Sequence, residues 1–120
     1  MAAEETTVQQ VAAALHRYCI ERGLDEDHGV MQWALDAEPL RLAPHLDPYV
    51  GTVSGIGIAL FAYLRMRSGA DAIKPDRRVR GRLSKLGFDV PAGDTALLLL
   101  AEAAAEELGV SRITLDQLLW

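Results

Sequence analysis

The spacing of apolar residues constrains this chain most strongly, because apolar side chains recur at intervals of three and four along most of the sequence. Such a period places them on one face of an α-helix. The segments that carry the period end at glycine, the residue that commonly terminates a helix, at Gly23, Gly69, Gly87 and Gly109. No stretch alternates with period two, so strands are not expected. The sequence therefore predicts an all-α fold, a compact multi-helix orthogonal bundle.

Capping residues and prolines mark where the expected helices begin and end. Thr7 is the expected N-cap of the first helix, Asp47 and Pro48 open a short helix that Gly51 interrupts, and Ser111 caps the last helix. The other expected helices cover residues 27–35, 38–45, 58–68, 74–86 and 92–108. At 120 residues we expect a single helical domain, with N-terminal helices over residues 1–46 and a second part over residues 47–120.

The composition excludes several classes of protein. No apolar run approaches the ~20 residues that span a bilayer, and the acidic start of the chain lacks the basic region of a secretory signal. A single cysteine, Cys19, leaves no partner for an internal disulfide. His16, His28 and His45 stand far apart without metal-type spacing, so we expect neither a metal nor a cofactor. These features predict a cytoplasmic protein that does not enter a membrane.

Basic residues gather in one part of a chain whose net charge is −5. Eight of the twelve lie between Arg65 and Lys85 against two acidic residues, which gives this segment +6 and the remainder −11. Such segregation indicates an anionic partner for one face, or pairing with acidic helices of the same fold or of a second subunit. The basic side chains of the helix after Pro75 cover most of its circumference, so they do not all face one partner.

Gly55, Ile56 and Gly57 form a predicted tight turn before a strongly apolar helix. Glycine permits the unusual dihedral angles of such a turn and the close approach of a ligand. Backbone amides at the start of the following helix, together with the helix dipole, make a site suited to phosphate. We therefore expect the turn to bind phosphate through its N–H groups. We expect Lys74, Arg77 and Arg78, at the start of the next helix, to supply positive charge for this contact.

Several short motifs stand in a fixed order from this turn to Trp120. They are Ser54-Gly55-Ile56-Gly57, then Ile73-Lys74-Pro75-Asp76-Arg77-Arg78-Val79-Arg80, then Lys85-Leu86-Gly87, and finally Leu115-Asp116-Gln117-Leu118-Leu119-Trp120. Their order and spacing resemble the helix-hairpin-helix DNA glycosylases, the endonuclease III superfamily. The resemblance covers roughly residues 47–120. It implies a helix-hairpin-helix motif within the bundle, which in that family grips the DNA backbone.

The resemblance also implies a role for Asp76. In that family an aspartate at the start of the helix after the hairpin assists loss of a flipped-out base, and Asp76 matches its position. An ionised carboxylate there stabilises positive charge that develops on the sugar. The alternative is that Asp76 complements the dipole of its own helix. Bifunctional members carry a lysine just after the hairpin glycine, where this chain has Ile58, Ala59 and Leu60, so Schiff-base chemistry is not expected.

The resemblance as a whole implies a DNA-binding helix-hairpin-helix protein that lacks the catalytic lysine. Two alternatives stay open: a monofunctional base-excision glycosylase that uses Asp76, and a non-catalytic helical module for protein interaction. Whether the chain is an enzyme is also open, since fewer helices precede the hairpin than the family's helical barrel requires. DNA is the expected partner, and a second copy of the chain in a homodimer is the other candidate.

The sequence also predicts the surroundings of two tryptophans and two arginines. Trp33 and Trp120 are expected in the core, where tryptophan most often buries its large ring. Arg65 and Arg67 follow the turn on one helix, from which they reach either a phosphate or the nearby aspartates.

Overall fold

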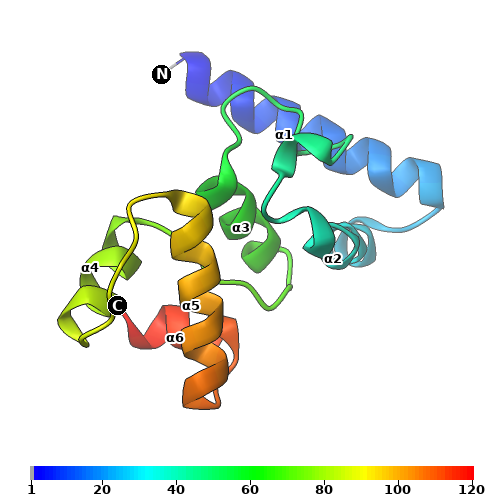
Figure 1. Ribbon diagram of the computed structural model, residues 1–120. Helices are drawn as coiled ribbons and strands as arrows, with labels where there is room; N and C mark the ends of the chain where they lie inside the picture. The colour runs from blue at the N-terminus through cyan, green and yellow to red at the C-terminus, as the bar shows by residue number, and fades with distance from the viewer. Residues whose placement is uncertain (1) are drawn as a thin grey trace.

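The computed structural model describes residues 2–120, with side chains from residue 5 onward. Every regular element in this range is a helix, as predicted. In chain order the elements are α1 (Ala2–Arg22), α2 (Glu26–Asp36), η1 (Glu38–Leu40), η2 (Pro44–Leu46), α3 (Ile58–Arg67), α4 (Arg77–Lys85), α5 (Asp94–Leu108) and α6 (Arg112–Leu118). In Figure 1, α1 runs along one side of the molecule and packs on α2, while α5 contacts α3, α4 and α6.

Side-chain caps fix the starts of three helices. Asp25, Asp76 and Ser111 each accept a hydrogen bond from the backbone N–H three residues later, at the starts of α2, α4 and α6. The cap expected at Ser111 is therefore confirmed. The cap expected at Thr7 is wrong, because α1 already begins at Ala2 and encloses that residue. The single helix expected over residues 38–45 is split into the short 3₁₀ elements η1 and η2.

Residues 48–55 form consecutive turns instead of the short helix expected after Asp47. The buried Asp47 carboxylate still makes the contacts of a helix N-cap, because its Oδ2 accepts the amides of Val50 and Gly51 at 2.8 and 2.9 Å, and it also accepts Nε1 of Trp33 at 3.2 Å. No helix continues from this cap. Gly51 packs so tightly that a Cβ there would lie 1.7 Å from the Pro44 carbonyl oxygen. Within the described chain the expected hairpin therefore keeps its turn and its second helix, α3, but not its first helix.

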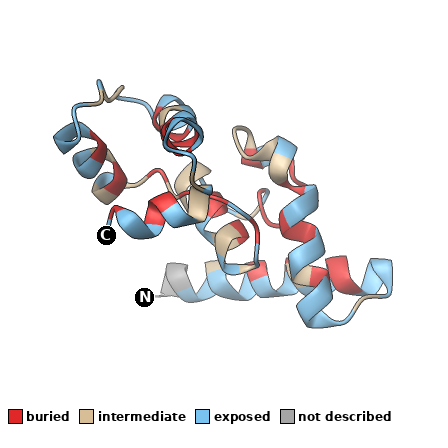
Figure 2. Cartoon of the chain, turned by 90° about the horizontal axis from the view of Figure 1, so that it is seen from below, coloured by how far each residue is buried: buried red, intermediate tan, exposed pale blue. Residues whose placement is uncertain are grey.

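The buried apolar side chains form two separate cores. Figure 2 colours the buried residues of each helix red. The first core joins α1, α2 and α3 and contains Val11, Ala14, Tyr18, Trp33, Ala34, Ala37, Val50, Phe61 and Ala70. The second joins α4, α5 and α6 and contains Ile73, Val79, Leu83, Leu97, Leu98, Ala101, Ala104, Ala105, Leu115 and Leu119. The core position expected for Trp33 is confirmed, since it is 1% exposed. Because each core is small, contacts between the elements of the two cores are needed to hold the fold together.

An ionic cluster of Glu38, Arg41, Arg65, Glu102 and Arg112 links the elements that carry the two cores. Glu38 in η1 accepts hydrogen bonds from Arg65 of α3 and, at 2.7 Å, from Arg112 of α6. Arg41 donates to Glu102 of α5 at 2.7 and 3.0 Å. Arg65 is 2% exposed and donates also to a carbonyl of α2 at 2.9 Å. The expectation that Arg65 reaches a phosphate or a nearby aspartate is therefore wrong, because a carboxylate 27 residues upstream binds it.

The charges of this ionic cluster shift the pKa values of its members. Burial by itself would raise the pKa of the Glu38 carboxyl, but the hydrogen bond from Arg112 and the charge of Arg65 outweigh burial and lower this pKa. Burial lowers the pKa of the Arg65 guanidinium, and the charge of Glu38 acts in the opposite direction. An arginine starts from so high a pKa that it stays protonated at neutral pH, so both partners are charged there.

Replacing Glu38 with glutamine is expected to destabilise the fold by about 2 kcal/mol, because it leaves the buried Arg65 without its counter-charge. The loss is smaller than for a fully buried pair, since the Glu38 side chain is 36% exposed. Because the folded-state pKa of Glu38 is lowered, its stabilisation is present above the usual value near 4.5 and is lost as the pH falls through the folded-state pKa. Urea unfolding at pH 7 and through the acid range measures both effects.

The matched control is Asp94→Asn, which removes an exposed carboxylate 3.9 Å from Arg80. An exposed pair of this kind is expected to contribute at most about 0.5 kcal/mol. Equal losses in the two variants, or a Glu38→Gln loss that stays constant into acid, would contradict the role assigned to Glu38.

Candidate functional site

A groove of about 640 Å³ brings three of the predicted site residues together. Its walls come from the C-terminal half of α3, the start of α4, and α6 with the residues after it. The groove is lined by Tyr63, Met66, Arg67, Lys74, Asp76, Arg78, Ile113, Asp116, Gln117 and Trp120. Figure 1 shows the C-terminal end of the chain beside α4. Lys74, Asp76 and Arg78 thus line one groove, without the turn residues and Arg77 that the sequence analysis grouped with Lys74 and Arg78.

Asp116 holds the start of α4 against α6. Its carboxylate is almost completely buried, with Oδ2 accepting the Lys74 N–H at 2.9 Å and Oδ1 accepting Nη2 of Arg78 at 2.9 Å. The backbone carbonyl of Asp116 accepts a further bond from Nη1 of Arg78, also at 2.9 Å. Two bonds to one guanidinium fix its plane as well as its position. Arg78 is therefore held rigidly, and its charge is balanced within the fold.

Asp76 is the N-cap of α4. Its Oδ1 accepts the Val79 N–H at 2.9 Å, and its Oδ2 lies 3.8 Å from Nη2 of Arg78. A carboxylate in this position satisfies an otherwise unpaired amide and faces the positive end of the helix dipole. The contacts of Asp76 therefore agree with the structural alternative considered from the sequence.

Two aromatic rings line the groove, and each has a cation over its face. Cζ of Arg78 lies 4.4 Å from the centroid of the Trp120 ring, and Nζ of Lys74 lies 5.1 Å from that of Tyr63. Both distances are within the range of cation–π attraction. Trp120 is 78% exposed, so its expected place in the core is wrong. Leu119 occupies the core position at this end of the chain, which leaves the next side chain outside.

The eight basic residues between positions 65 and 85 divide into two sets. Arg65, Arg78 and Arg80 donate to carboxylates or carbonyls of the fold. In the described part of the chain, the other five side chains make no ion pair or hydrogen bond: Arg67, Lys74, Arg77, Arg82 and Lys85. Of these five, Arg67 and Lys74 line the groove. Arg77, a predicted site residue, is exposed on α4 and does not line it.

The predicted phosphate-binding turn lies at the other end of α3. Gly55 has a φ of 95°, which agrees with the turn expected there. The Ile56 N–H donates to the Val53 carbonyl at 3.2 Å, and its side chain packs against the first core. Gly57 immediately precedes α3, whose ten residues extend for about 15 Å. None of the three glycine-turn residues lines the groove, to which α3 contributes only its C-terminal half.

The sequence analysis missed the roles of Tyr63, Asp116 and Trp120. A signal was available, because Tyr63 and Arg67 stand four residues apart, as do Asp116 and Trp120. Residues at this spacing share one face of a helix, which holds for Tyr63 and Arg67 on α3, whereas Trp120 lies beyond the end of α6. The sequence does not show that these two pairs meet across the start of α4.

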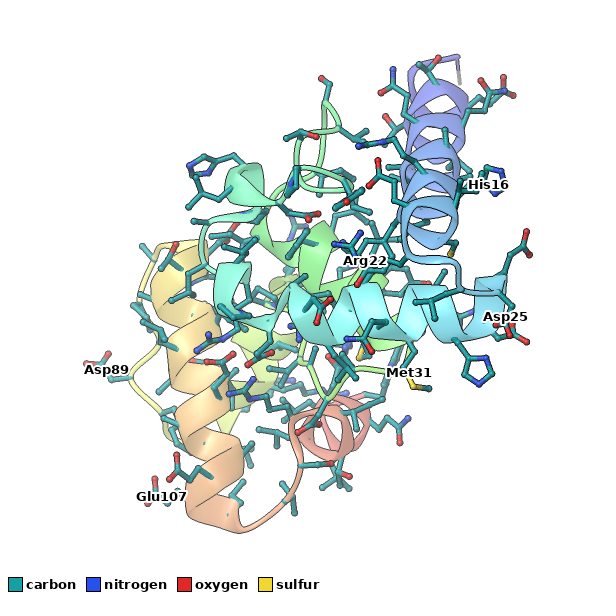
Figure 3. The ribbon with its side chains drawn as sticks, turned by 90° about the vertical axis from the view of Figure 1, so that its right-hand side faces the viewer. His16, Arg22, Asp25, Met31, Asp89 and Glu107 are labelled. Carbon is teal, nitrogen blue, oxygen red and sulfur yellow. The ribbon has the colours of Figure 1, made fainter. Side chains whose placement is uncertain are left out.

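Histidines and several acidic residues lie away from this groove. In Figure 3, His16, Asp25 and Asp89 point away from the body of the molecule. Among residues 5–120, whose side chains the structure describes, no three acidic, histidine or cysteine side chains converge as metal ligands. The helices in the same range also lack the combined length and apolar character that a membrane span requires.

Replacing Asp116 with asparagine is expected to destabilise the fold by about 2 kcal/mol, because Arg78 loses its charged acceptor. The matched control is Asp76→Asn, since asparagine caps a helix about as well as aspartate and should cost at most a few tenths of a kcal/mol. Urea unfolding of both variants tests the assignment. A larger loss of stability for Asp76→Asn than for Asp116→Asn would contradict the assignment of Asp116 as the charged partner of Arg78 and of Asp76 as a helix cap.

Comparison with known proteins adds no family to this description. No protein-family model, no curated protein and no solved structure matches the chain. The resemblance to the helix-hairpin-helix glycosylases therefore stays a prediction from short motifs, and the function has to be argued from the groove.

Proposed function

We propose that this protein binds nucleic acid, with DNA as the expected form, through the groove between α3, α4 and α6. The observation that carries the proposal is the position of two cations without ionic partners, Arg67 and Lys74, in one groove with the exposed rings of Tyr63 and Trp120. Cations bind phosphate, and aromatic rings accept bases by stacking. A groove that supplies both suits a polymer that alternates phosphate and base.

The charge distribution limits how this binding works. The total of −5 repels a polyanion, so attraction has to come from the local surface. Within the groove, Asp76 caps α4 and Asp116 binds Arg78, and the single charge of Arg78 faces both carboxylates. The five charged residues of the groove, Arg67, Lys74, Asp76, Arg78 and Asp116, therefore sum to +1, and Arg67 and Lys74 are the cations among them without an ionic partner in the described chain. Binding is therefore expected to be weak at physiological salt and much stronger at low salt.

We assign binding, and no catalytic reaction, to this groove. The N-cap bond of Asp76 accounts for its position without a reacting base. The turn at residues 55–57 stands apart from the groove, so it adds at most a second contact to a long ligand. The proposed function thus keeps the expected partner but moves the main contact from the turn to the groove.

The test is a titration of a fluorescein-labelled oligonucleotide, followed by fluorescence anisotropy from low to physiological salt. Two phosphate contacts predict that log K falls with log salt with a slope of about −1.4 to −1.8. Arg67→Gln and Lys74→Gln should each weaken binding several-fold and make this slope shallower by nearly one unit, because each removes one phosphate contact.

The matched control is Arg77→Gln, which removes an exposed charge from α4 outside the groove. It should change binding less than either groove variant. Two results would overturn the proposal: no detectable binding at low salt, or a loss with Arg77→Gln as large as with Arg67→Gln and Lys74→Gln.

A further inference from the structure

Trp120 lines two hollows on the surface, the groove and a second, smaller one. Besides the groove, it lines a smaller hollow of about 180 Å³ with Arg82, Lys85, Leu86, Leu118 and Leu119. Of these, Arg82 and Lys85 are cations without an ionic partner in the described chain. The indole ring therefore lines two hollows, and each holds two cations that lack an ionic partner in the described chain. These are Arg67 and Lys74 in the groove, and Arg82 and Lys85 in the smaller hollow.

The two sides of this ring differ in their surroundings. The Arg78 guanidinium lies over the ring and is fixed there by Asp116. Because the side chain is 78% exposed despite this contact, much of the ring stays open to solvent. Leu86 and Leu118, next to it in the smaller hollow, are 62% and 68% exposed. A large ring with a cation over one face and most of its surface exposed is suited to stacking against a flat ligand.

We infer that Trp120 is the stacking platform for an unpaired base of single-stranded nucleic acid. The backbone of this strand would contact Arg67 and Lys74 on one side of the ring, and Arg82 and Lys85 on the other. This inference rests on the proposed function and narrows it to one ligand class. A base inside a duplex is stacked on both faces and cannot reach the ring, whereas a base in a single strand can.

The protein's two tryptophans allow a direct measurement. Trp33 is 1% exposed, so quenching of tryptophan fluorescence by a stacking ligand reports on Trp120. The probes are a 12-nucleotide oligothymidylate, the matching oligouridylate, a 12-base-pair DNA duplex and inorganic polyphosphate, all at low salt. The oligothymidylate should quench the fluorescence and bind at least tenfold more tightly than the duplex. The oligouridylate shows whether the site distinguishes DNA from RNA, and polyphosphate should bind without quenching.

Variants separate stacking from charge. Trp120→Ala should weaken oligothymidylate binding by about 5- to 150-fold, the range for one stacked base, while Trp120→Phe should retain part of the affinity. The matched control is Leu108→Ala, which removes another exposed apolar side chain, at the end of α5. The double variant Arg82→Gln with Lys85→Gln should weaken binding, whereas Arg77→Gln, on the same helix but outside both hollows, should have the smaller effect.

The outcomes distinguish this inference from the proposed function. If duplex and single strand bind equally and Trp120→Ala changes nothing, the stacking role is overturned while nucleic-acid binding stands. If polyphosphate matches the oligonucleotide in affinity, the surface is a plain anion site and the base plays no part. If none of the nucleic acids binds, both proposals are wrong. Circular dichroism of the Trp120 variants checks that a lost affinity does not come from unfolding.

Discussion

The carboxylate of Glu38 connects α3 to α6, and the rest of the structure depends on this contact. It accepts hydrogen bonds from Arg65 of α3 and Arg112 of α6, which belong to opposite sides of the groove. Arg65 stands between Tyr63 and Arg67 in the sequence of α3, and Arg112 precedes Asp116 by one helical turn. The ionic cluster thus joins α3 to α6, two of the elements that form the groove walls, while Asp116 joins α6 to the start of α4. Apolar packing forms each core, and these ionic contacts connect the elements between the cores.

The sequence predicted most of the helices because their signals are local. Capping side chains at Asp25, Asp76 and Ser111 act within three residues, and a glycine follows within two residues of the ends of α1, α3, α4 and α5. The prediction was wrong at residues 48–55, where a proline after Asp47 is typical of a helix start. There the Asp47 carboxylate accepts two amides of the next turn, as a helix N-cap does, and also Nε1 of Trp33, 14 residues away. Gly51 lies directly against the Pro44 carbonyl, and a short-range pattern does not contain tertiary contacts of this kind.

The candidate site was predictable only in part, for the same reason. Lys74, Asp76 and Arg78 lie within five positions of one helix start, so their proximity follows from the sequence. The partner of Arg78 does not, because Asp116 is 38 residues away. The count of eight basic residues also overstated the charge available to a ligand, since Arg65 is enclosed by the fold. Counting charges along a sequence does not separate those that stabilise the fold from those that face a partner.

This division between enclosed and free arginines has a consequence for how such a protein changes over evolutionary time. Arg67, Arg77 and Arg82 contact no acidic group, so selection can replace them at little cost to folding and so adjust the attraction for a polyanion. Arg65 and Arg78 do not have this freedom, because each satisfies a buried or partly buried carboxylate. Folding therefore constrains Arg65 and Arg78 in related chains but leaves Arg67, Arg77 and Arg82 free to change, so an arginine kept at position 67 would reflect binding and one kept at position 65 would reflect the fold.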